Sequence, residues 1–147
     1  MKKAFVSILL VGVLCLPNGW VAASSSSVPA WVKARVEEGH RCRRWENLFR
    51  KHDLPVVAFT YIAWRESRCN PVATNGRWDK YGNLIFTKNS NGTYDSGLLQ
   101  INSGWKSLTV RVCGGKEWDR RLLFDPKCNV AVAEALFAED GLAPWGM

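Results

Sequence analysis

The sequence lacks the patterns that mark several large classes of protein. No apolar run reaches the roughly 18 residues that a mature membrane-spanning helix needs. The cysteines form no C-x-x-C pair, and neither histidine stands at a ligand-like spacing from them, which argues against a metal site. A Ser/His/Asp nucleophile elbow and a phosphate-binding loop are absent too, so hydrolases of those kinds have no support. We therefore predict no metal and no cofactor.

Negative charge is also scarce. The 147 residues contain 20 Lys and Arg against 13 Asp and Glu, which gives a formal net charge of +7. A basic chain suits an anionic partner such as nucleic acid, an anionic lipid surface or an acidic cell-wall polymer, and charge alone leaves these open. The basic stretch 41–51 is either a solvated helix face or an attraction site for such a polymer. No nucleic-acid recognition motif is present, so we predict no nucleic-acid partner.

The first residues have the pattern of a secretory signal peptide. Lys2 and Lys3 precede an apolar stretch from residue 4 to 16, and small residues end at Ala23. We therefore interpret residues 1–23 as a signal peptide, residues 24–29 as a polar tether and residues 30–147 as one domain. This predicts export to the periplasm or the exterior, with no stable membrane anchor after cleavage.

The cysteines fit this interpretation. Cys15 lies within the predicted signal peptide, which leaves four in the exported chain. An even number of cysteines in an exported protein predicts disulfides, and three pairings are possible. We favour Cys42–Cys69 and Cys113–Cys128, because each pair ties neighbouring segments.

Periodicity predicts a mainly helical α+β fold. Helical patterns run over 30–51, 53–67 and 125–141, and the almost wholly apolar stretch 56–64 requires a helix that is buried on most sides. That helix must stop before Asn70-Pro71, so Glu66 lies at its end. Residues 75–96 are rich in glycine and asparagine between short apolar runs, which predicts a small antiparallel sheet of two or three strands.

Two motifs resemble those of lysozyme-like proteins. The segment Ala63–Ser67 (A-W-R-E-S), followed by Asn70-Pro71, resembles the helix end of lytic transglycosylases. The segment Asp95–Trp105 (D-S-G-L-L-Q-I-N-S-G-W) resembles a stretch of animal-type lysozymes. This resemblance implies a lysozyme-like fold whose small sheet flanks an active-site cleft.

The resemblance assigns roles to two carboxyl groups. Glu66 matches the general acid and base, and a hydrophobic helix end favours the protonated carboxyl group that such an acid needs. For that reason we expect Arg65 and Arg68 to point away from it. Asp95 matches the second carboxylate, which acts as a nucleophile or stabilises an oxocarbenium-like transition state. The alternatives are a surface glutamate at a helix end and an aspartate that caps its own turn.

The resemblance further implies that Gln100, Asn102, Trp105 and Trp145 bind substrate, although tryptophans are also ordinary core residues. Gly97 lets a sugar approach the backbone, forms a tight turn, or does both. The predicted function is a monomeric, secreted glycosidase that cleaves peptidoglycan, or a chitin-like glycan, by hydrolysis or lytic transglycosylation. In peptidoglycan its target is the bond between N-acetylmuramic acid and N-acetylglucosamine. The alternative is a non-catalytic lysozyme-like protein that binds glycans or a partner.

Overall fold

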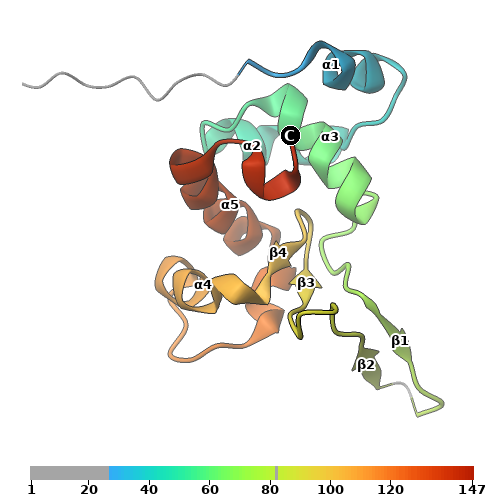
Figure 1. The fold of residues 1–147 in the computed structure, drawn as a ribbon, viewed down its shortest axis with the longest axis vertical. Coiled ribbons are helices and arrows are strands. Elements are labelled where there is room, and N and C mark those ends of the chain that lie inside the picture. Colours follow the sequence, from blue (N-terminus) through green and yellow to red (C-terminus); the bar gives the residue numbers. More distant parts are fainter. Residues whose placement is uncertain (1–26, 82) are drawn as a thin grey trace, which may run out of the picture.

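The computed structural model describes residues 27–81 and 83–147. The predicted signal peptide and residues 24–26 of the predicted tether lie outside this part of the chain. The described residues form five α-helices and two small antiparallel sheets (Figure 1). The fold is α+β and mainly helical, as predicted.

The helices account for most of the body. They are α1 (Ala30–Glu37), α2 (Glu46–Lys51), α3 (Val56–Ser67), α4 (Lys106–Cys113) and α5 (Pro126–Asp140). Three short 3₁₀ turns matter for the site: Ser103–Trp105, Arg120–Phe124 and Ala143–Trp145. We call the last of these the C-terminal turn.

The predicted apolar helix lies at the centre of the helical part. Helix α3 packs against both α1 and α2, and its residues Phe59 and Ile62 are fully buried. The Phe59 ring meets Phe137 of α5 and Trp145 of the C-terminal turn edge-on, at centroid distances of 5.6 and 5.0 Å. Burial on nearly every side explains why this stretch carries so few polar residues.

Helix α5 begins and ends where its sequence predicts. The Asp125 side chain accepts a hydrogen bond from the Lys127 backbone amide, Pro126 occupies the first turn, and Gly141 follows the last. The disulfide Cys113–Cys128 joins the end of α4 to this first turn, with a Cα–Cα distance of 5.3 Å.

The sheet prediction needs a correction. Two separate two-stranded sheets form instead of one: β1 (Gly76–Trp78) pairs with β2 (Leu84–Phe86), and β3 (Asp95–Ser96) pairs with β4 (Ile101–Asn102). The first hairpin projects from the body (Figure 1). The loop 87–94 separates β2 from β3. A β-bridge between Thr74, which precedes β1, and Ser96 of β3 links the two segments.

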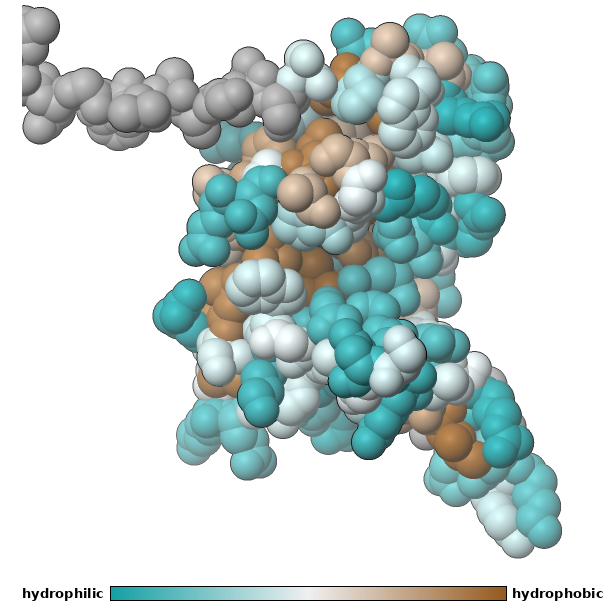
Figure 2. Space-filling view, in the orientation of Figure 1, coloured by the Kyte–Doolittle hydropathy of each residue, from teal (hydrophilic) through white to brown (hydrophobic). Residues whose placement is uncertain are grey.

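Hydrophobic and hydrophilic residues are unevenly distributed over the surface. Figure 2 shows hydrophilic residues over most of one face, with hydrophobic residues gathered in its middle and on the projecting hairpin. On that hairpin Ile85 is 42% exposed. Among the described residues, no helix is long and apolar enough to cross a membrane.

Candidate active site

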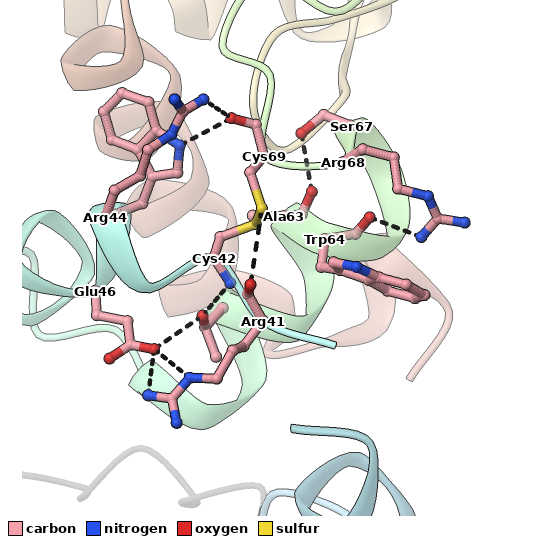
Figure 3. The surroundings of a disulfide bond; sticks show 11 residues. Arg41, Cys42, Arg44, Glu46, Ala63, Trp64, Ser67, Arg68 and Cys69 are labelled. Atoms are coloured by element: carbon pink, nitrogen blue, oxygen red, sulfur yellow. Dashed lines mark hydrogen bonds and ion pairs between the residues drawn. A yellow bond between two sulfur atoms is a disulfide. The ribbon is translucent and has the colours of Figure 1, made fainter. Parts of the chain in front are cut away.

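Glu66 lies in the last turn of α3. The end of this helix is held by covalent and polar contacts (Figure 3). Cys69 follows the helix and forms a disulfide with Cys42, the pairing favoured from the sequence. The Cys69 carbonyl oxygen accepts hydrogen bonds from the Trp45 indole, at 3.0 Å, and from the Arg44 guanidinium. These contacts fix the position of the backbone that carries Glu66.

The Glu66 side chain is 28% exposed and forms an ion pair with its neighbour Arg65. Nε of Arg65 donates to Oε1 of Glu66 at 2.7 Å, and Nη2 lies 2.5 Å from the same oxygen. The expectation that Arg65 points away is therefore wrong. Its guanidinium turns inward because a second acceptor, the Trp145 carbonyl oxygen, lies 2.6 Å from Nη2. Arg68 does point elsewhere and lies over the Trp64 ring, 3.8 Å from its centroid.

Two aromatic residues that precede Glu66 on α3, Tyr61 and Trp64, face other parts of the fold. Tyr61 packs with Val32 and Val36 of α1, and Trp64 stacks on His40 with 4.1 Å between ring centroids. Residues two and five positions before Glu66 project from other faces of the helix, so they cannot surround its carboxyl group. Hydrophobic contact at the site comes from the C-terminal turn instead.

Asp95 opens β3 and lies opposite Asn102 of β4 in the sheet register. Its Oδ1 accepts a hydrogen bond from the Asn102 amide at 2.7 Å, and its Oδ2 accepts one from the Asn89 amide at 2.8 Å. Both amides also donate to the Thr93 hydroxyl, at 2.8 and 3.1 Å. Asp95 is thus held by neighbouring side chains through both oxygens, an arrangement that suits a carboxylate with only acceptor sites.

Two adjoining cavities bring the predicted site residues together. The first has a volume of about 230 Å³ and is lined by Arg65, Glu66, Asp95, Gln100, Pro144 and Trp145. The second has a volume of about 190 Å³ and is lined by Asp95, Gln100, Ile101, Asn102, Trp105, Leu136, Pro144 and Trp145. Because they share four residues, we treat them together as the cleft. All six predicted catalytic and substrate-binding residues line it, and the two carboxylates line the same cavity.

Gln100 and Asn102 use their side-chain amides within the protein. The Gln100 amide donates to the carbonyl oxygens of Ala73 and Gly97, at 3.1 and 2.9 Å. Asn102 caps the 3₁₀ turn Ser103–Trp105 by accepting from the Gly104 amide at 2.8 Å, in addition to its contact with Asp95. Both residues therefore shape the cleft wall.

The two tryptophans occupy different environments in the cleft. Trp105 is 39% exposed, as suits a side chain that stacks on a sugar. Trp145 is 7% exposed, and its indole donates to the Leu99 carbonyl oxygen at 3.0 Å. Trp145 is thus a wall residue that is fixed at both its ring and its backbone.

Gly97 is required by the packing of the chain on itself. It has a φ of +83°, and a Cβ atom there would lie 2.0 Å from the Leu123 carbonyl oxygen and 2.2 Å from the Asn129 amide nitrogen. The fully buried Asn129 side chain donates to the Ser96 and Leu123 carbonyl oxygens and accepts from the Leu99 amide. The tight-turn alternative therefore describes Gly97, and the close approach is made by protein atoms.

Sequence reasoning missed several residues that build the site. Asn89 and Thr93 could have been found, because a turn at Asn91-Gly92 places them opposite each other, as their backbone hydrogen bond at 2.7 Å shows. Asn129 had no such signal, since α5 also carries other polar residues and nothing in the sequence marks this one as buried.

This arrangement combines a carboxyl group beside an aromatic wall with a second carboxylate held by amides. Such a pair can supply an acid and a stabilising negative charge to one bond. A cleft of this kind, lined from both the helical part and β3–β4, defines a lysozyme-like α+β domain.

The chain belongs to the transglycosylase SLT domain family, whose model matches residues 44–140, about two thirds of the chain. The matched segment contains Glu66, Asp95 and Trp105 and ends before Trp145. A comparison with curated proteins finds no match. Membership of this family supports an enzyme of the lytic transglycosylase type, with peptidoglycan as its substrate.

Proposed function

We propose that this protein is a secreted lytic transglycosylase, with Glu66 as the general acid and base. Its target is the bond between N-acetylmuramic acid and N-acetylglucosamine in peptidoglycan. The observation that carries the proposal is that the Glu66 and Asp95 carboxylates line one cavity in a chain of this family.

The reaction has two proton transfers. In its protonated form, the Glu66 carboxyl group donates a proton to the glycosidic oxygen while the bond from that oxygen to C1 of the muramic acid breaks. The carboxylate then takes the proton of the C6 hydroxyl of the same sugar while O6 bonds to C1. The product carries a 1,6-anhydro ring, Glu66 is protonated again, and no water is consumed.

Asp95 has an electrostatic role in this proposal. Positive charge develops at C1 and the ring oxygen in the transition state, and a carboxylate fixed nearby stabilises it. Asn89 and Asn102 hold both oxygens of Asp95, so the negative charge does not need to reorganise during the reaction. Pre-organisation of this kind is what makes electrostatic stabilisation effective.

Hydrolysis is the second candidate, and the firm placement of Asp95 favours it. Asp95 would then act as the nucleophile or the stabiliser, and Glu66 would activate a water molecule in place of the C6 hydroxyl. The product would contain one more water than the anhydro sugar, so product masses distinguish the two reactions.

We also propose that the protein is exported to the periplasm or the exterior, where peptidoglycan is accessible. The N-terminal pattern and the two disulfides support this location. We propose that residues 30–147 act there as a single monomeric domain.

The test is digestion of purified peptidoglycan by wild type, Glu66→Gln and the control Glu139→Gln, with product masses recorded. Glu139 is exposed near the end of α5, so its variant should match wild type. Glu66→Gln should lose about 10²- to 10⁴-fold in rate because the amide cannot donate an acidic proton. A Glu66→Gln protein with full activity would overturn the mechanism. A wild type that binds glycan without cleaving it would favour the non-catalytic alternative.

A further inference from the structure

The contact between Arg65 and Glu66 is unexpected for two consecutive residues of one helix. Adjacent helical side chains project in different directions and do not normally face each other. Here the guanidinium reaches Oε1 of Glu66 through Nε, and Nη2 reaches the Trp145 carbonyl oxygen, 80 positions later in the chain. The side chain therefore bridges α3 and the C-terminal turn.

We propose that Arg65 is a positioning residue that fixes the Glu66 carboxylate and the C-terminal turn relative to each other at the cleft. It rests on the proposed function, because the positioned group is the proposed acid and base. The observations that carry it are the two acceptors of one guanidinium and the place of both acceptors in the lining of one cavity.

The bridge determines which oxygen of Glu66 is available. Both nitrogens of Arg65 that contact the carboxylate meet Oε1. From the described part of the chain, Oε2 accepts no hydrogen bond, so it is the oxygen that can exchange a proton with a substrate. Arg65 thereby limits the rotation of the carboxylate, and rotational order of this kind is worth orders of magnitude in rate.

The same bridge fixes one wall of the cleft. Trp145 lines both cavities and is anchored through its indole to Leu99 and through its carbonyl oxygen to Arg65. Arg65 and Glu66 are 32% and 28% exposed, so their pair is better shielded from water than a fully exposed surface pair. Loss of Arg65 would free the Glu66 carboxylate and remove one of the two anchors of Trp145.

Arginine suits this role because of its geometry. A guanidinium carries five N–H donors in a planar fork and can serve two acceptors at once. A lysine ammonium keeps the charge but lacks the fork, so Arg65→Lys should restore only part of the function that Arg65→Gln loses.

The experiment compares Arg65→Gln, Arg65→Lys and Arg68→Gln with wild type. Arg68→Gln is the matched control, since it removes the same charge three residues further on, where the guanidinium lies over Trp64. For Arg65→Gln we expect kcat on peptidoglycan to fall about 10- to 100-fold with little change in KM. The kcat of Arg65→Lys should lie between those of Arg65→Gln and wild type, and the kcat of Arg68→Gln should match wild type. A loss confined to KM would overturn the proposal.

A second readout does not depend on activity. In NMR spectra, Arg65→Gln should shift the signals of the Trp145 indole N–H and the Glu66 carboxyl carbon, and Arg68→Gln should leave both in place. Unchanged signals in Arg65→Gln would overturn the positioning role. Full activity of Glu66→Gln, with shifted signals in Arg65→Gln, would overturn the proposed mechanism and support the bridge.

Discussion

The two carboxylates of the cleft are held by different kinds of interaction. Glu66 stands on a helix of which seven of the twelve residues are buried, and its carboxylate contacts one charged neighbour. Asp95 stands on a two-residue strand and is held by two neutral amides. The helical side is therefore positioned by a buried helix, a disulfide at the end of that helix and one ion pair, and the sheet side by directional hydrogen bonds from neutral amides.

The sheet side depends on further polar bracing. The Arg120 guanidinium carbon lies 3.3 Å from the Phe86 ring centroid and 3.8 Å from that of Tyr94, the residue before Asp95. Arg120 opens the 3₁₀ turn Arg120–Phe124, whose Leu123 carbonyl oxygen accepts from Asn129. Because such contacts depend on geometry, we expect changes of shape to damage this side most.

The largest expected effect is that of Gly97→Ala. The added Cβ would meet the Leu123 carbonyl oxygen and the Asn129 amide at contact distances that force the backbone to shift. We expect a loss of about 3 kcal/mol or more in the free energy of unfolding, measured by urea denaturation.

Gly92→Ala provides the matched control. Gly92 also has a positive φ, of +79°, but nothing lies within 4 Å of its Cβ position. The free energy of unfolding of Gly92→Ala should fall by about 1 kcal/mol, because only backbone strain is added. Equal losses in the two variants would show that the contacts behind Gly97 do not brace the sheet side.

The same contrast explains what the sequence could predict. Long apolar runs and the Asp125-Pro126 cap identify α3 and α5, because burial and capping leave local patterns. Helix α4 was not predicted, since only Leu108 and Thr109 are buried and the apolar signal is weak. The division into two sheets was missed because two-residue strands are defined by their pairing.

The candidate site shows a similar division. The resemblance implied that Glu66 and Asp95 lie at one cleft, and in the structure both residues line the same cavity. The direction of Arg65 was wrong because it depends on Trp145, which only the tertiary fold brings near. A side-chain direction that is set by a distant acceptor leaves no local pattern in the sequence.

An intermediate effect is expected for Asp95→Asn. The variant keeps the size of the side chain but removes the charge, and its amide cannot accept a hydrogen bond at both positions. If Glu66 alone transfers protons, kcat should fall about tenfold, equivalent to about 1.4 kcal/mol, well below the loss for Glu66→Gln. Peptidoglycan digestion with both variants measures this. An equal loss in both would assign Asp95 a nucleophilic role and favour hydrolysis.

The smallest expected effect concerns Asp119, which caps the 3₁₀ turn that begins with Arg120. The side-chain hydrogen bond from Arg121 lowers the pKa of the Asp119 carboxyl group from its usual 3.8. When the pKa of a carboxyl group is lower in the folded state, the group stabilises the protein at pH values above its unfolded-state pKa. This contribution disappears as the pH falls through the folded-state pKa. Asn keeps the cap but removes the charge, so Asp119→Asn should melt slightly below wild type at neutral pH. The difference should shrink as the pH falls below 3.8 and vanish once the wild-type carboxyl group is protonated as well. A difference that persists in acid would mean that the cap geometry, and not the charge, braces the sheet side.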